Sequence, residues 1–196
     1  LRQEYLSATL SEKSVADDPI SQFAKWFAEA LDADLYEPNV MTLATATHDG
    51  KPSPRVLLLK GFDNSGFTFY TNYLSRKGKE ISKNPSAAMV FYWGELERQV
   101  RIEGHLEKVS KEESERYFHS RPKASQLGAI ASQQSQVIPN RGVLESSLKE
   151  LEERFHDKEV PKPAYWGGYI LKPQIVGFWE GGEEEGDERG AVHAAG

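Results

Sequence analysis

The stretch Arg55-Val56-Leu57-Leu58-Leu59-Lys60 predicts a central strand around which the rest of the chain is organised. Its four central residues are all apolar, which is typical of a strand that is buried on both faces. Turn residues flank it at 50–54 and 61–66. Such a strand would hold the Arg55 guanidinium and the Lys60 ammonium at a fixed spacing beside an anion, with phosphate as the obvious candidate. The alternative is an ordinary core strand whose charged ends reach solvent.

Seven strands are predicted from runs of apolar, β-branched and aromatic residues between turn residues. Five lie close together, and two more follow near the end of the chain. Short connections favour antiparallel neighbours, so the first five predict a meander that closes into a small barrel. The fold class is therefore mainly β, of the α+β type. The predicted strands are residues 40–46, 54–62, 67–72, 87–93, 99–109, 165–171 and 174–179.

Helices are predicted on either side of these strands. Asp18 and Pro19 are typical of a helix start, and apolar residues at helical spacing continue to Leu31. Ser110 begins a capping box, and Pro122 interrupts the helix that follows. A further amphipathic helix is predicted at residues 144–155.

A short polar helix at residues 75–81 is a candidate anion site. Arg76 and Lys77 lie in its first turn, where the helix dipole disfavours positive charge. A phosphate at the free N–H groups of this end would relieve that conflict. The alternative is a basic turn exposed to solvent.

Tyr117, Arg121 and Ser125 are a second candidate. They are spaced by four residues, so they project on one side if helical geometry holds, and they offer a phenol, a guanidinium and a hydroxyl to a second phosphate. Ordinary exposed side chains are the alternative. The loop at 132–136 is rich in amides and hydroxyls that can bond a heteroaromatic ring.

Composition excludes several classes of function. The 196 residues fit one domain, predicted at 1–179, and residues 180–196 predict an acidic, glycine-rich, flexible tail. A net charge of −6 argues against a nucleic-acid or membrane-surface binder, and no apolar run is long enough to span a membrane. No signal peptide is recognisable, so a cytoplasmic location is expected. The chain starts without Met, which is consistent with a missing leader segment.

Metal and nucleophile chemistry find little support in the sequence. The chain has no Cys, and its five His lack metal-ligand spacing, so no metal is expected. No P-loop, GxGxxG or GxSxG pattern is present, and no catalytic acid or base can be named. Two phosphate-like sites without an acid–base pair indicate chemistry carried by a cofactor.

Collinear motifs carry a resemblance to a known family over about residues 1–179. The chain resembles the pyridoxine (pyridoxamine) 5'-phosphate oxidases, FMN enzymes with a split-barrel fold. Its markers are Arg55–Lys60, Phe69-Tyr70-Thr71-Asn72, Ser75-Arg76-Lys77, Glu97-Arg98-Gln99-Val100-Arg101, Tyr117-Phe118-His119-Ser120-Arg121-Pro122, Gln134-Ser135, Val160-Pro161, Trp166-Gly167-Gly168 and Phe178-Trp179.

The resemblance implies roles for individual residues. It implies a homodimer with FMN bound between subunits, and oxidation of a vitamin B6 phosphate by O2 to pyridoxal 5'-phosphate with release of hydrogen peroxide. The implied substrate contacts are Lys60, Tyr117, Arg121 and Ser125, with Arg2 and Tyr5 from an N-terminal segment over the site. The implied FMN contacts are Arg55, Val56, Leu57, Leu58, Tyr70, Thr71, Arg76, Lys77, Gln99, Gln134, Ser135, Trp179 and Arg189.

The C-terminus departs from the family pattern. Glu185 and Asp187 stand where the family has an Arg and a His that contact the substrate, and the usual C-terminal strand is not recognisable. Carboxylates there should weaken binding of a phosphate ester. The alternative function is therefore an FMN- or pyridoxal-phosphate-binding homologue with little oxidase activity. A split-barrel flavin reductase that uses a nicotinamide donor fits the phosphate contacts less well.

Overall fold

The computed structural model describes residues 16–132, 134–135, 140–181 and 188–193, the last range by its backbone. The predicted contacts Arg2 and Tyr5 and the altered positions Glu185 and Asp187 lie outside the described residues. Within the described part of the chain, no helix has the length and apolar content needed to cross a membrane.

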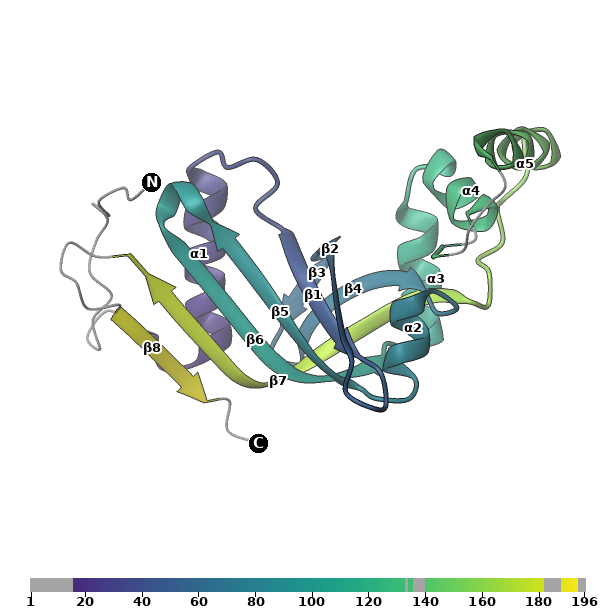
Figure 1. Cartoon of the computed structure of the whole chain (residues 1–196). Helices are drawn as coiled ribbons and strands as arrows, with labels where there is room; N and C mark the ends of the chain where they lie inside the picture. The colour runs from purple at the N-terminus through teal and green to yellow at the C-terminus, as the bar shows by residue number, and fades with distance from the viewer. Residues whose placement is uncertain (1–15, 133, 136–139, 182–187, 194–196) are drawn as a thin grey trace.

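The described residues form a strongly curled antiparallel sheet with helices around it (Figure 1). The prediction of a mainly β, α+β split barrel is confirmed. In chain order the elements are α1 Pro19–Asp32, β1 Val40–Ala46, β2 Pro52–Leu58, β3 Gly61–Asp63, β4 Gly66–Asn72, α2 Arg76–Ile81, β5 Ser86–Trp93, the 3₁₀ turn η1 Gly94–Leu96, β6 Arg98–Lys108, α3 Lys111–Ser120, α4 Lys123–Ala131, α5 Arg141–Arg154, β7 Trp166–Glu180 and β8 Glu188–His193.

The strand order corrects the predicted meander. It is β2-β1-β5-β6-β7-β4-β3, so β4 pairs with the first half of β7 and not with β5. β8 pairs with the second half of β7. Short connections correctly predict the β1–β2, β3–β4 and β5–β6 hairpins. They contain no information about which hairpins lie side by side, because that depends on residues far apart in the chain.

The stretch 55–60 differs from the predicted strand in two ways. β2 is an edge strand that pairs with β1, and the Val56 side chain is 65% exposed, so the strand is not buried on both faces. It also ends at Leu58 instead of continuing to Phe62. The Leu59 N–H donates to Asn39 O, whereas the Lys60 N–H donates to Thr68 O of β4. Leu59 and Lys60 therefore join the two ends of the curled sheet.

The two strands predicted at 165–171 and 174–179 are one long strand, β7. Pro173 and Gln174 suggest an interruption because proline cannot donate a backbone hydrogen bond. The pairing with β6 instead shifts register between Glu103 and Gly104, opposite Pro173. This irregularity lets the strand continue through the proline.

The main core lies between α1 and the curled sheet. Asp18 caps α1 by accepting from Ser21 N, and the helix buries its aromatic face as predicted. Phe23 is fully buried and contacts the rings of Phe62, Phe67 and Phe91 at centroid distances of about 5 Å. This packing fixes the sheet on which the candidate site is built.

A second core joins α3 and α4 to the start of β7. It contains the buried residues Phe118, Leu127, Val160 and Trp166. Gly168 of β7 has no room for a Cβ, which would lie 2.8 Å from the Tyr70 ring. This close approach places the Tyr70 ring directly against β7 beside the second core.

Part of the region predicted as a tail lies within the described residues. Glu180 is the last residue of β7, is buried, and bonds Arg98 Nε at 2.6 Å. Strand β8 then pairs with β7 over residues 188–193. Acidic and glycine-rich composition predicts flexibility, but the unpaired edge of β7 offers backbone hydrogen bonds to any extended segment.

Candidate functional site

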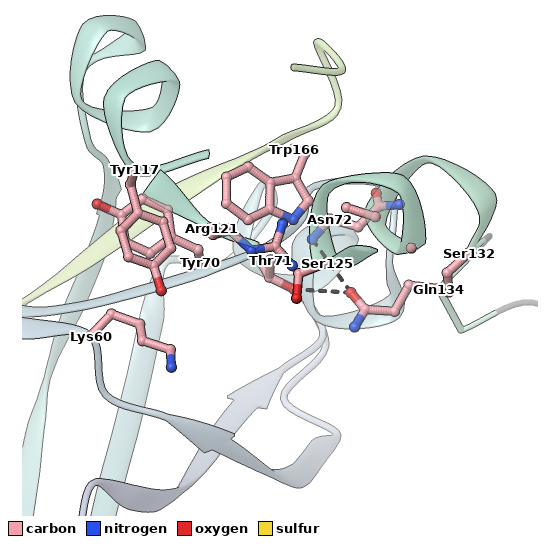
Figure 2. Close-up of a pocket in the computed structure, with 12 residues that line it drawn as sticks. Lys60, Tyr70, Thr71, Asn72, Tyr117, Arg121, Ser125, Ser132, Gln134 and Trp166 are labelled. Atoms are coloured by element: carbon pink, nitrogen blue, oxygen red, sulfur yellow. Dashed lines mark hydrogen bonds between the residues drawn. The ribbon is translucent and has the colours of Figure 1, made fainter. Parts of the chain in front are cut away.

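Four of the six predicted substrate contacts lie among the described residues, and these four meet at one cavity of about 420 Å³. Lys60 comes from the connection after β2, Tyr117 from α3, Arg121 from the α3–α4 junction and Ser125 from α4. Figure 2 shows these side chains around the same space, together with Tyr70, Thr71 and Gln134, which are predicted flavin contacts. The cavity is of the size that small-molecule sites occupy.

The spacing of Tyr117, Arg121 and Ser125 suggested one helix, but the structure places them on two helices and the junction between them. α3 ends at Ser120, and Arg121 is extended, with φ −77° and ψ 150°. Pro122 disfavours helical geometry in the residue before it, so the chain turns before α4 begins at Lys123. The three side chains still converge, because the turn brings the start of α4 beside the end of α3.

An aromatic stack forms one wall of the cavity. The Tyr70 and Tyr117 rings are stacked with centroids 3.7 Å apart, and the Trp166 ring is nearly parallel to both. The Tyr70 hydroxyl donates to Glu113 Oε1 at 3.2 Å. Burial, with the Glu113 charge as a second cause, raises the pKa of Tyr70, so this phenol stays protonated.

Arg121 is held over the Trp166 ring, with Cζ 4.8 Å from the centroid. Its Nη1 atom is buried, and among the described residues it has no hydrogen-bond acceptor. Burial lowers the pKa of Arg121, partly opposed by Tyr117, but an arginine remains charged. A buried guanidinium nitrogen without an acceptor fits an anion in this cavity.

Lys77 is a buried cation with neutral partners. Its side chain is 5% exposed, and Nζ donates to Thr71 Oγ1 at 3.1 Å, Ser75 Oγ at 3.4 Å and Gln134 Oε1 at 3.3 Å. Burial lowers the pKa of Lys77 to about 8, and the charge of Arg55 adds to the effect. Because a buried ammonium is stabilised by an opposite charge, this position also fits an anion.

Glu80 links the other two cations predicted to bind the flavin. It accepts from Arg76 Nε at 2.9 Å and from Arg55 Nη2 at 3.4 Å. Burial alone would raise the pKa of Glu80, but hydrogen bonds from Thr45, Ser53 and Arg76 outweigh it and bring the pKa to about 2. Sequence reasoning missed Glu80, although its place four residues after Arg76 is a recognisable signal for an ion pair.

Gln134 connects the buried Lys77 to the cavity that contains Arg121. Its Oε1 atom accepts from Thr71 Oγ1 at 3.0 Å and from Asn72 N at 3.4 Å (Figure 2). It also accepts from Lys77 Nζ. Ser135 follows with φ +67°, the left-handed region that a serine rarely adopts. The polar loop predicted at 132–136 thus reaches the cavity through Gln134.

Three predicted flavin contacts lie far from this cavity. Gln99, Trp179 and Arg189 stand opposite one another in register across β6, β7 and β8. Tyr70 pairs with Gly168, eleven residues before Trp179 on β7. At about 3.3 Å per residue this is roughly 36 Å along the strand. A single chain therefore places its predicted flavin contacts in two separate groups.

The remaining predicted contacts lie on β2. Val56 faces solvent, and Leu57 and Leu58 are half-buried, with Leu57 packed against the main core. The family resemblance implies that these residues contact flavin through their backbone. Among the described residues, the edge position of β2 leaves one side of that backbone without a strand partner.

Residues 27–155 match the family model described as pyridoxamine 5'-phosphate oxidase. The chain belongs to this family. It is 56% identical over 189 residues to a pyridoxine/pyridoxamine 5'-phosphate oxidase from Rubrobacter xylanophilus, covering 96% of this chain and 87% of that protein. It is 59% identical over 165 residues to the pyridoxine-5'-phosphate oxidase of Bos taurus, covering 84% of this chain and 63% of that protein.

Solved structures place the pyridoxamine 5'-phosphate oxidase fold in a wider group. PhzG from Burkholderia lata 383, in complex with tetrahydrophenazine-1-carboxylic acid, superposes with a TM-score of 0.85 at 28% identity, covering 96% of this chain and 98% of that one. A pyridoxamine 5'-phosphate oxidase-related, FMN-binding protein from Nostoc punctiforme superposes with a TM-score of 0.70 at 20% identity, covering 93% of each chain. The chain is thus a member of an oxidoreductase family, and one structure with the same fold holds tetrahydrophenazine-1-carboxylic acid.

Proposed function

We propose that this protein binds FMN and oxidises pyridoxine 5'-phosphate and pyridoxamine 5'-phosphate to pyridoxal 5'-phosphate. The observation that carries the proposal is the cavity where Lys60, Tyr117, Arg121 and Ser125 converge beside Thr71. Identities above 50% to proteins named for this oxidation support it, whereas PhzG is 28% identical.

Two features of the described residues fit two phosphate groups. The buried Lys77 ammonium, with neutral partners, fits the phosphate of FMN, and the Nη1 atom of Arg121 fits the phosphate of the substrate. Thr71 and Gln134 accept hydrogen bonds from Lys77 and also line the cavity that contains Arg121. When bound, FMN supplies the acceptor for a hydride and reacts with O2 to give hydrogen peroxide.

The protein's own contribution to this reaction is positioning. Lys60 and Arg121 hold the phosphate of the substrate by charge, and Tyr117 and Ser125 add hydroxyl donors. The Trp166 ring fixes Tyr117 and Arg121 relative to each other. Fixing the phosphate in this way orients the reacting C4' carbon without a strong acid or base from the protein.

We also propose that the protein is a homodimer with one flavin site at each end of the interface. About 36 Å of strand separates Trp179 from the Thr71 group, so one flavin reaches both only if Trp179 comes from a second chain. Large apolar side chains support this assembly, because Tyr36 is 89% exposed and Tyr92 67% exposed. They line one groove together with Val56.

The first test is a flavin and peroxide assay. Purified protein is expected to carry about one FMN per chain, measured by absorbance after release, and to produce peroxide from pyridoxine 5'-phosphate in air. Protein that takes up no FMN would contradict the proposal. Full FMN occupancy without turnover would favour the alternative, a cofactor-binding homologue with little oxidase activity.

The second test asks whether each flavin site uses two chains. Lys77→Met and Trp179→Ala subunits are co-expressed with different tags, and mixed dimers are isolated on both tags. Each homodimer is expected to bind FMN much more weakly and to be isolated with little of it. The mixed dimer regains about half of the wild-type flavin content, because both lesions fall in one of its two sites. Mixed dimers that bind no FMN would place all contacts in one chain.

Surface variants provide the control for assembly. Tyr92→Glu adds a charge to the exposed groove and is expected to give monomers by sedimentation analysis, with loss of FMN. Val143→Glu changes another exposed apolar residue, on α5, and is expected to leave the dimer intact.

A further inference from the structure

Glu80 lies at the centre of a buried cluster that neither the motifs nor the comparisons assign a role. Its side chain is 5% exposed. Oε2 accepts from the Thr45 hydroxyl, from Ser53 Oγ at 2.7 Å and from Arg55 Nη2 at 3.4 Å. Oε1 accepts from Arg76 Nε at 2.9 Å. The carboxylate therefore connects β1, β2 and α2.

These bonds fix the orientation of two guanidinium groups. Arg55 donates through Nη1 to Leu43 O and Thr45 Oγ1, and through Nη2 to Ser53 Oγ and Glu80. Arg76 is 63% exposed and, among the described residues, is bonded through Nε, which leaves both its Nη groups for a ligand. A guanidinium held at Nε presents its outer edge in one direction.

The charges of the cluster match a phosphate monoester. Arg55, Arg76 and Lys77 bring three positive charges near one carboxylate, which leaves two. A phosphate monoester carries about −1.5 to −2 at pH 7. Without Glu80, the three cations would repel one another, and the exposed Arg76 would be free to turn towards solvent.

We propose that Glu80 is a positioning residue that orients Arg76 for the phosphate of the flavin and holds the charge of Arg55 beside it. This proposal rests on the proposed function, because it assumes that FMN is the ligand. Its consequence is specific. Glu80 strengthens binding of the phosphate-bearing flavin, while riboflavin, which lacks the phosphate, is bound equally well with or without it.

The sign of the effect separates positioning from simple electrostatics. A carboxylate beside an anion site repels the anion, so Glu80→Gln makes the local field more positive. Field alone therefore predicts tighter FMN binding. Positioning predicts weaker FMN binding. The Gln amide has a single acceptor oxygen, so it cannot accept hydrogen bonds from all four donors that surround it, and it no longer holds the guanidinium groups in place.

The experiment measures dissociation constants for FMN and riboflavin by fluorescence titration of the apo dimer. Glu80→Gln is expected to weaken FMN binding about tenfold and to leave riboflavin binding unchanged. In an Arg76→Ala background the same substitution should cost much less, because the residue it positions is gone. The matched control is Glu145→Gln, which removes an exposed ion pair with the same spacing and atoms, Arg141 Nε to Glu145 Oε1 at 2.7 Å.

A second variant covers the case in which Glu80→Gln does not fold. Ser53→Ala removes one donor to Glu80 and one acceptor of Arg55 while all charges remain, and it is expected to weaken FMN binding a few-fold without affecting riboflavin. Equal losses for both flavins, or tighter FMN binding, would overturn the role of Glu80. Wild-type protein that binds neither flavin would instead overturn the proposed function.

Discussion

Lys77→Met is expected to raise the Kd for FMN about 30- to 100-fold, because it removes a charged hydrogen bond to the phosphate from a buried position. Met is apolar and of similar length, so it fills the space of the Lys stem. Removing a buried charge without an ionic partner is expected to leave the melting temperature of the apo protein unchanged or to raise it. Flavin titration and thermal unfolding of the same samples measure both effects.

The pH dependence of FMN binding tests the same residue. Burial brings the pKa of Lys77 to about 8, below its ordinary value of 10.5, so the apo protein loses this charge as pH rises through 8. FMN affinity is therefore expected to fall above pH 8 in the wild type and to change much less in Lys77→Met. The sign for apo stability is opposite: the unfolded chain binds the extra proton between pH 8 and 10.5, so stability rises with pH there.

Lys79→Met is the control, because Lys79 lies on the same short helix and is exposed. It should leave the Kd for FMN within about twofold of the wild type. An unchanged Kd in Lys77→Met would refute the assignment of the flavin phosphate to this position.

Arg121→Ala is expected to raise KM for pyridoxine 5'-phosphate about 30- to 100-fold while kcat changes little. The reason is that a phosphate distant from the reacting carbon is bound equally in the ground state and in the transition state. The buried Nη1 atom of Arg121 has no hydrogen-bond acceptor among the described residues. Binding of the substrate phosphate therefore breaks no hydrogen bond of this atom. Steady-state kinetics with measured FMN occupancy separates the two constants.

Two comparisons test this assignment of Arg121. Pyridoxine without its phosphate should react equally slowly with wild type and variant, since neither can use a phosphate contact. Arg154→Ala removes an exposed arginine on α5 and should leave KM unchanged. A large fall in kcat with constant KM would show that Arg121 acts in the transition state instead.

Local sequence patterns predicted the elements well where neighbours in the chain decide them. Asp18 and Ser110 cap their helices as expected, because a cap bonds to residues only three positions away. The prediction failed at Pro173, where a shift in pairing with β6 keeps β7 continuous. It also failed at Val56, because the exposure of an apolar residue on an edge strand depends on which strands lie beside it.

The candidate site shows the same division. Tyr117, Arg121 and Ser125 were predicted to meet Lys60, and all four line one cavity. The prediction assumed helical spacing for the first three residues, but the helix ends before Pro122. The resemblance also gave Gln99 and Trp179 as flavin contacts without showing that they lie at the other end of β7. Residue types and motif order contain no distances.

The sequence by itself determined the family, the helices other than α4, the hairpins and the residue types that suit phosphate groups, because these depend on short-range spacing and on chemistry. Only the tertiary structure decided that β4 pairs with β7, that Leu59 and Lys60 join the ends of the sheet, and that Glu80 bonds both Arg55 and Arg76. Each of these depends on hydrogen bonds that form when distant segments pack together. The burial that brings the pKa of Lys77 to about 8 is likewise a property of the packed fold.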